Sequence, residues 1–227
     1  MIQKTISILI LLTISILSFG QFERYNSYEQ LDSLSKIYHQ KKDFDSAILA
    51  IEYALEQYPD NEEKATSTLG FLYVRGGYDS KALKNWSYGH TKGYYYGLNL
   101  YIQYKNYFKD NSEFKSIAAK DKRLGDSLDR NSHLKYYVSL PTNYETDSIY
   151  PILFIFHGNV SNIDKAKKVW TSHMLTDKFI VVYLQSYIHV DLFHYKWHYN
   201  DAKTKKEFVQ IYNNITNTYS VDRNKIK

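Results

Sequence analysis

The side chains of this sequence that could carry chemistry gather between residues 157 and 198. His189, His194 and His198 lie close to Asp191 along the chain, and imidazole and carboxylate groups are ligands that zinc accepts. Their spacing matches no zinc signature. Aromatic residues are interleaved with them and suggest a loop that covers a site, namely Phe193, Tyr195, Trp197 and Tyr199. We therefore expect no metal and no cofactor in this region.

Two serines, Ser161 and Ser186, follow apolar runs and could be considered as nucleophiles. Neither has the sharp turn or the neighbouring base that activates a serine hydroxyl. The sequence has no Gly-x-Ser-x-Gly string, and the nearest one, from Gly89 to Gly93, holds a threonine after an expected helix. We expect His157 to hold a turn by hydrogen bonds rather than to shuttle protons. The sequence thus offers no complete catalytic set.

Alternating strands and helices are expected to position these residues. Short β-rich or fully apolar runs predict strands at 136–140, 152–156 and 179–183, and helices are predicted at 165–172 and 207–218. A strand that is apolar on both faces is buried between two layers of helices. The pattern predicts a mostly parallel α/β sheet.

The segment from His157 to Asn162 follows the second of these strands and resembles a loop of the α/β-hydrolase superfamily. Further matching features are Tyr150-Pro151, the Tyr-x-Gln end of 179–185, Trp197 and the run 219–226. Over residues 136–227 the series resembles exported esterases of the feruloyl-esterase and polyhydroxyalkanoate-depolymerase type; prolyl-oligopeptidase-like peptidases share its early part. The resemblance implies oxyanion-hole donors among the backbone N–H groups of Gly158, Asn159 and Val160, with His157 supporting the motif, because glycine lets an amide approach a developing alkoxide.

The sequence departs from this family in one decisive respect. In such enzymes the Val-Asp-x-x-x-Ile run, here from Val221 to Ile226, leads into the strand that carries the nucleophilic serine. We expect that strand to begin only at Lys227, so that nucleophile, acid and base are absent and the chain is truncated and inactive on esters. The sheet would then expose an apolar edge, and the α/β part would fold poorly by itself.

Residues 25–130 predict stacked helical hairpins. The first copy carries Leu31, Ser35, Ala47 and Ile51 at the spacings of a tetratricopeptide repeat, followed by Pro59. A second copy carries Thr66, Leu69, Gly70, Tyr73, Ala82, Trp86 and Gly89 at the same relative spacings. Helices are also expected at 94–108 and 113–128, where they would cap the stack or seat it on the next domain. The region predicts either a protein-binding surface or a spacer.

The first twenty residues are typical of a secretory signal peptide, with Lys4 before an apolar run and small residues before Gln21. The run is shorter than the roughly 20 residues of a bilayer span, so no stable membrane anchor is expected after cleavage. We expect an exported, periplasmic or extracellular protein. A net charge of +5 without a dense basic block gives no support for nucleic-acid binding, and zero Cys excludes disulfides and cysteine nucleophiles.

The sequence therefore predicts an α plus α/β protein in three parts: a signal peptide at 1–20, a tetratricopeptide-like domain at 21–130, and a partial α/β-hydrolase domain at 133–227. The predicted function is that of a serine esterase-like protein without its catalytic serine, whose substrate would be an ester if the site were completed. The alternative is a scaffold that binds a protein partner through its repeats, with a vestigial hydrolase part.

Overall fold

The computed structural model describes residues 20–226, which divide into two compact units. The first unit holds the described residues up to Tyr94 together with 110–117, and the second holds 95–109 and the residues from Ala118 onward. The expected signal peptide, apart from Gly20, lies outside the described residues. Among the helices that the structure describes, none is long and apolar enough to cross a membrane.

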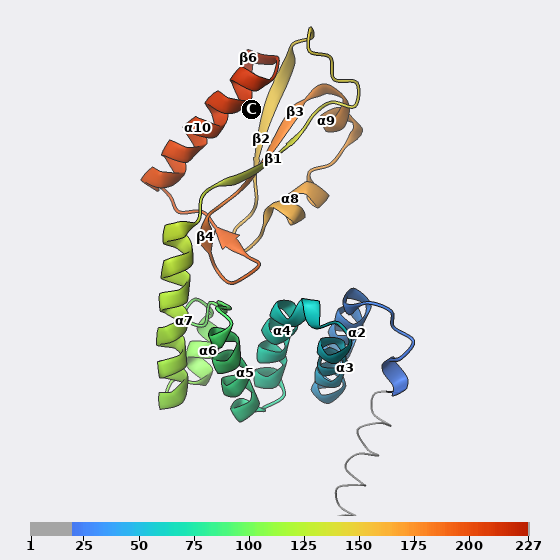
Figure 1. Cartoon of the computed structure of the whole chain (residues 1–227), viewed down its shortest axis with the longest axis vertical. Helices are drawn as coiled ribbons and strands as arrows, with labels where there is room; N and C mark the ends of the chain where they lie inside the picture. The colour runs from blue at the N-terminus through green and yellow to red at the C-terminus, as the bar shows by residue number, and fades with distance from the viewer. Residues whose placement is uncertain (1–19, 227) are drawn as a thin grey trace, which may run out of the picture. The chain divides into compact units, whose positions relative to one another are not determined.

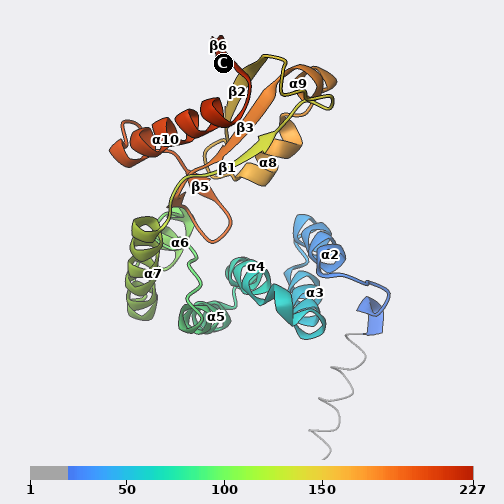
Figure 2. The ribbon, with the colours of Figure 1, turned by 45° about the horizontal axis from the view of Figure 1, so that its top comes forward.

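The first unit is built from two helical hairpins (Figures 1 and 2). Its elements are η1 (Gly20–Phe22), α2 (Tyr28–Gln40), α3 (Phe44–Gln57), η2 (Pro59–Asn61), α4 (Glu62–Arg75) and α5 (Asp79–Thr91). The side chains of Ser27 and Asp43 accept backbone N–H bonds at the starts of α2 and α3, which fixes where each helix begins. The helices lie where the repeat spacing predicted helices.

Small residues let the helices of each hairpin approach closely. Ser35 Oγ donates to the Ala47 carbonyl oxygen at 2.9 Å inside the first hairpin. In the second hairpin, a Cβ added to Gly70 would lie only 2.3 Å from Nε1 of Trp86. The small side chains that the sequence places at these positions therefore set the spacing between the helices.

The second unit begins with a short helical region made of α6 (Ile102–Tyr107) and the later part of α7 (Ser112–Asn131). The prediction of one helix over 94–108 is wrong, because only its end is helical. The fully buried Asp121 carboxylate accepts the N–H groups of Tyr96 and Leu98 at 2.8 and 2.7 Å, and Gly97 between them has φ +68°. These bonds hold residues 95–98 in a turn instead of a helix.

A four-stranded mixed sheet forms the rest of the second unit. Its strands are β1 (Lys135–Ser139), β2 (Tyr150–Phe156), β3 (Ile180–Gln185) and β6 (Val221–Ile226), in the order β1-β3-β2-β6. β2 is parallel to β3 and β6, while β1 is antiparallel to β3. The chain is thus an α plus β protein whose sheet is mostly parallel, as the alternating pattern predicted.

Helices cover both faces of this sheet (Figure 1). On one face, Ile152, Val182 and Leu184 pack with Ile211 and Ile215 of α10 (Ala202–Thr218). On the other face, Ile155, Val181 and Tyr183 pack with Ala166, Ile163 and Leu175, which belong to α8 (Ile163–Val169) and α9 (His173–Lys178). Adjacent residues of β3 enter opposite cores, which explains why this strand is apolar throughout.

The end of the sheet differs from the expectation. The run from Val221 was expected only to lead toward a strand, yet it forms β6 and pairs with β2. The expectation of an exposed apolar edge is therefore wrong, because β2 is paired on both sides. The edge strand β6 instead carries Asp222, Arg223 and Lys225, and charged side chains discourage edge-to-edge aggregation.

Candidate functional site

The turn that follows β2 holds the most unusual backbone of the second unit. Residues 158–160 connect Phe156 and His157 to Ser161, which forms an isolated bridge with Tyr195. Val160 in this turn has φ +51°, the left-handed region that β-branched residues avoid. Backbone in a sparsely populated conformation persists only where the surroundings impose it, and such residues cluster at functional sites.

The backbone N–H groups of this turn are available. Gly158, Asn159 and Val160 are all exposed, and within residues 20–226 their N–H groups have no hydrogen-bond acceptor. Val160 is the one of the three whose φ lies in the left-handed region. The turn brings together the three amides that the sequence analysis named.

The ring of His157 fixes the start of the turn. Its Nε2 accepts the N–H of Ser186 at 3.2 Å, so the proton lies on Nδ1, which donates to the Gly158 carbonyl oxygen at 2.7 Å. Burial lowers the pKa of His157, although the bond to Gly158 acts in the opposite direction. Both ring nitrogens are engaged with backbone groups, so the imidazole is a neutral structural element of the turn.

A loop from residue 186 to 199 is hydrogen-bonded to both ends of the turn. Trp197 Nε1 donates to the His157 carbonyl oxygen at 2.9 Å, and Ser161 and Tyr195 exchange two backbone bonds of 3.2 and 2.8 Å. The loop contains the two-stranded ribbon of β4 (Ile188–His189) and β5 (Tyr195–Lys196). Strand, histidine and loop therefore hold the free amides in a fixed arrangement.

The loop is itself anchored by a buried carboxylate. Asp191 Oδ1 accepts the N–H groups of Phe193 and His194 at 2.8 and 2.9 Å, and Oδ2 accepts the hydroxyl of Tyr101. Burial raises the pKa of Asp191, but hydrogen bonds from His194 and Tyr101 outweigh it, and the pKa lies below its usual value. The same contact raises the pKa of His194. Asp191 stays ionised and closes the loop.

The histidines named as candidate metal ligands are separated by the fold. His189 binds Asp129 through both its backbone N–H and its Nδ1, each at 2.9 Å, whereas His194 pairs with Asp191. His198 is exposed. In the part of the chain that the structure describes, no group of three or more His, Cys, Asp or Glu residues could hold a metal ion.

The two serines near the turn have structural positions. Ser161 is buried in the bridge to Tyr195. Ser186 Oγ donates to the Lys196 carbonyl oxygen at 2.6 Å and accepts the N–H of Ile188 at 3.1 Å. The Ser186 hydroxyl is thus bound to two backbone groups, and the Ser161 backbone is fixed by its bridge to Tyr195.

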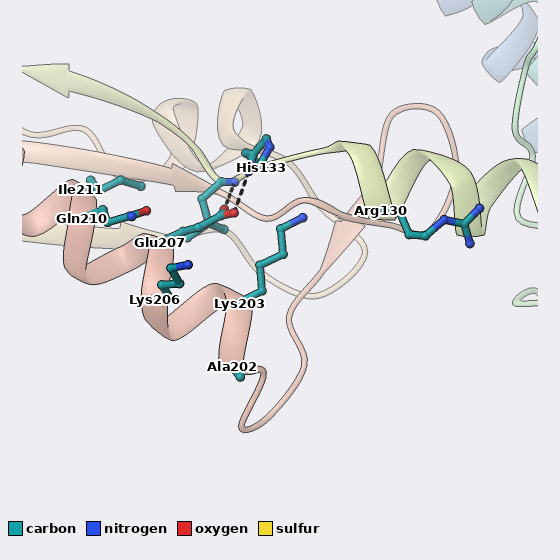
Figure 3. A pocket seen from close by; sticks show the side chains of 9 residues that line it. Arg130, His133, Ala202, Lys203, Lys206, Glu207, Gln210 and Ile211 are labelled. Atoms are coloured by element: carbon teal, nitrogen blue, oxygen red, sulfur yellow. Dashed lines mark hydrogen bonds and ion pairs between the residues drawn. The ribbon is translucent and has the colours of Figure 1, made fainter.

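A cavity of about 760 Å³ lies elsewhere in the second unit, between the end of α7, the start of β1 and α10 (Figure 3). The Glu207 carboxylate on its wall accepts the Leu134 N–H and contacts His133 Nδ1, each at 2.7 Å. Burial raises the pKa of Glu207, but these bonds outweigh it and lower the pKa overall. In Figure 3 the Arg130 side chain extends away from Glu207. The carboxylate therefore joins the segment just before β1 to α10.

No protein-family model matches the chain, and no curated protein shows significant similarity to it.

The turn after β2 presents three successive backbone N–H groups that have no acceptor within residues 20–226. It presents three amide donors at the carboxyl end of a strand flanked by parallel neighbours, and side chains that are themselves hydrogen-bonded hold it in place. Donors fixed before a reaction begins stabilise a developing oxyanion without reorganisation. Sequence reasoning missed Asp129 and Tyr101, which support the loop, because each acts on a segment remote in the chain and neither belongs to a recognisable motif.

Proposed function

We propose that the second unit is an α/β-hydrolase-type scaffold whose turn after β2 supplies the oxyanion-binding half of an ester-hydrolysing site. The single observation that carries the proposal is the turn itself: Gly158, Asn159 and Val160 offer unpaired amides, and Val160 is held at φ +51°. Such a turn binds the charged oxygen of a tetrahedral intermediate of acyl transfer.

The surroundings of the turn support this function. The mostly parallel sheet, covered on both faces, is the architecture that the resemblance implies, and open sheets of this kind bind ligands at the carboxyl ends of their strands. Phe156 at the end of β2 is partly exposed and contacts the Trp197 ring with centroids 5.1 Å apart. These rings give an apolar wall beside the donors, against which the organic part of an ester would lie.

The sequence shows no serine motif that would supply a nucleophile beside these donors. It contains no Gly-x-Ser-x-Gly after a buried strand, and the Ser186 hydroxyl donates to the Lys196 carbonyl oxygen. Oxyanion donors without a nucleophile and a base cannot form an acyl-enzyme. We therefore expect this chain to bind oxyanions and not to turn over esters.

Amide NMR tests the proposal directly. An anionic alkyl phosphonate monoester, which resembles the tetrahedral intermediate, is expected to shift the amide signals of residues 158–160 in the whole chain. Asn159→Pro removes one of the three donors and should weaken phosphonate binding at the remaining two, whereas the matched Asn159→Ala retains the N–H and should preserve it. Unchanged amide signals at high phosphonate concentration would refute the proposal. Labelling by a serine-directed phosphonate ester would contradict the expected lack of a nucleophile.

A second candidate function belongs to the first unit. We propose that its two hairpins are tetratricopeptide-like repeats that bind a protein partner, because the close approach at Gly70 and Ser35 is the packing that such repeats need. The proposal includes an exported location, where the partner would be found. A pull-down from the exported fraction with the whole chain tests this proposal. Capture of a partner that is lost when exposed residues of α2 or α4 are substituted would support a scaffold. If the chain captures no protein, the first unit is better described as a spacer.

A further inference from the structure

Three large apolar side chains are exposed together where α8 ends and α9 begins. Val169, Trp170 and Met174 are 67%, 53% and 61% exposed. Their neighbours in the same helices, Ala166 and Leu175, pack into the core under the sheet. The helices thus have one apolar face toward the core and a second apolar surface toward solvent, and an exposed apolar group of this kind marks an interaction site.

Side-chain contacts join this group to the edge strand β1. Lys167 Nζ lies 4.0 Å from the ring centroid of Tyr137, and the Tyr137 and Tyr183 rings are 6.3 Å apart. The Tyr183 hydroxyl donates to the Trp170 carbonyl oxygen at 2.7 Å. Tyr137, Lys167, Lys168, Val169, Trp170 and Met174 therefore form one surface, which we call the basic apolar patch.

The helices of the patch expose more lysines than carboxylates, the latter being Asp164 and Asp177. Lys165, Lys168 and Lys178 are exposed, and across residues 20–226 no carboxylate forms an ion pair with any of them. The nearby Asp177 carboxylate accepts the Thr142 hydroxyl at 3.2 Å. An anionic partner would meet unpaired ammonium groups beside the apolar side chains.

We propose that the basic apolar patch docks the protein on an anionic lipid bilayer. Trp and Tyr place their rings at the boundary between headgroups and acyl chains, and lysines around them attract anionic headgroups while their stems lie along apolar surface. The patch combines these residue types, with Lys167, Lys168, Val169 and Trp170 at consecutive positions, and the protein carries a net charge of +5. The inference does not depend on the proposed oxyanion site, since it uses α8, α9 and β1.

A single-cysteine probe tests the docking, because the natural sequence contains no cysteine. Met174→Cys in the whole chain is labelled with an environment-sensitive fluorophore and titrated with vesicles of phosphatidylcholine alone or mixed equally with phosphatidylglycerol. We expect a blue shift and protection from iodide quenching with the anionic vesicles only. The matched control is Val209→Cys, whose position on α10 is 54% exposed and should show neither effect.

The charge requirement is tested in the same assay. Lys167→Gln with Lys168→Gln should raise the lipid concentration at half-maximal shift about 25-fold, since each lysine near an anionic surface contributes roughly a factor of five. Salt should weaken the shift by screening. Vesicle binding without a shift at position 174 would mean that another segment binds the membrane and would overturn the proposal. An absence of vesicle binding would also overturn the proposal. So would a fluorescence shift at position 174 that appears without vesicles when the protein concentration is raised, because it would indicate self-association.

Discussion

Val160 adopts a backbone conformation that its own side chain disfavours. The left-handed region costs an L-residue roughly 1–2 kcal/mol, and Val160 occupies it at φ +51° while its side chain is 43% exposed. Burial of the Val160 side chain therefore does little to offset the energetic cost of its backbone conformation. The turn keeps its shape because His157, Trp197 and Ser161 hold both of its ends.

Substitution of this valine measures the strain. Val160→Gly is expected to raise the free energy of unfolding by about 0.5–1 kcal/mol, because relief of the left-handed strain exceeds the greater entropy of glycine in the unfolded chain. Val160→Ala keeps a Cβ and should give no comparable gain. Urea denaturation compares the variants. A loss of stability in the glycine variant would show that the turn is not strained.

Two histidines of the second unit should give it opposite pH dependences. Burial lowers the pKa of His157, so its folded form binds fewer protons than its unfolded form and stability falls as pH drops below the ordinary value of 6.5. The Asp191 contact raises the pKa of His194. The stabilisation of the fold by this histidine is therefore present below pH 6.5 and is lost as pH rises through the raised pKa.

Thermal midpoints between pH 5 and 8 separate these contributions. The difference in thermal midpoint between the wild type and His157→Gln should become smaller as pH falls, because only the wild type loses stability when the histidine of its unfolded form is protonated. The difference between the wild type and His194→Gln should widen over the same range. The two variants serve as controls for each other, and parallel curves for both would contradict the assignment.

Residue types and spacing could predict part of the site. The His157-Gly158 dipeptide after an apolar strand pointed to the turn, and the aromatic positions 193–199 pointed to a loop that covers it. The left-handed valine could not be predicted, since valine rarely adopts that conformation. The Asp129–His189 pair could not be predicted either, because 60 residues separate its members.

At the level of elements, the close helix packing of the second hairpin invites a direct test. Gly70→Ala would place a methyl group 2.3 Å from Trp86 Nε1. Overpacking of this kind costs roughly 1–3 kcal/mol, which outweighs the higher helix propensity of alanine. The helical circular-dichroism signal during urea unfolding reports the loss in both the native background and one without Trp86. In a Trp86→Phe background the added cost should be smaller, and an equal cost in both backgrounds would exclude the steric explanation.

The turn before α6 depends on one buried carboxylate. Asp121→Ala would leave the N–H groups of Tyr96 and Leu98 without their acceptor, and each buried unsatisfied group costs about 1–3 kcal/mol. We expect a loss of roughly 2–4 kcal/mol in the second unit. Asp121→Asn retains one acceptor oxygen and should lose less. Hydrogen exchange at residues 96 and 98 checks the mechanism, since both amides should lose protection first.

The elements that the sequence predicted best are those with a strong apolar pattern. The strands predicted at 152–156 and 179–183 and the helices at 113–128 and 207–218 are present with small shifts of their ends. The short α9, the ribbon β4–β5 and the polar strand β6 were missed, because tertiary hydrogen bonds define them rather than periodicity. The same reason explains why residues 95–98 form a turn, which Asp121 holds from another helix.

For the whole molecule, the sequence predicted a single boundary after Arg130, between helical repeats and a strand-helix domain. In the structure, residues 95–109 and the residues from Ala118 onward belong to the same compact unit as the sheet. Contacts that pattern reasoning cannot detect produce this difference. Tyr101 binds Asp191, and a Cβ on Gly97 would meet the Val190 carbonyl oxygen at 2.0 Å. The repeat pattern described helices correctly, but it carried no information about which partner they pack against.

Two compact units predict two unfolding transitions. Gly70→Ala should lower the midpoint of the transition that Trp86 reports, and Asp121→Ala should lower the one reported by Trp197 in the second unit. Each variant should leave the other transition nearly unchanged, apart from coupling through α7, whose residues belong to both units. The measurement is fluorescence-detected unfolding of chains in which Trp170 and one other tryptophan are replaced by phenylalanine. If both variants shift a single shared transition equally, the two units unfold as one cooperative body, because a two-state system has only one midpoint for every probe.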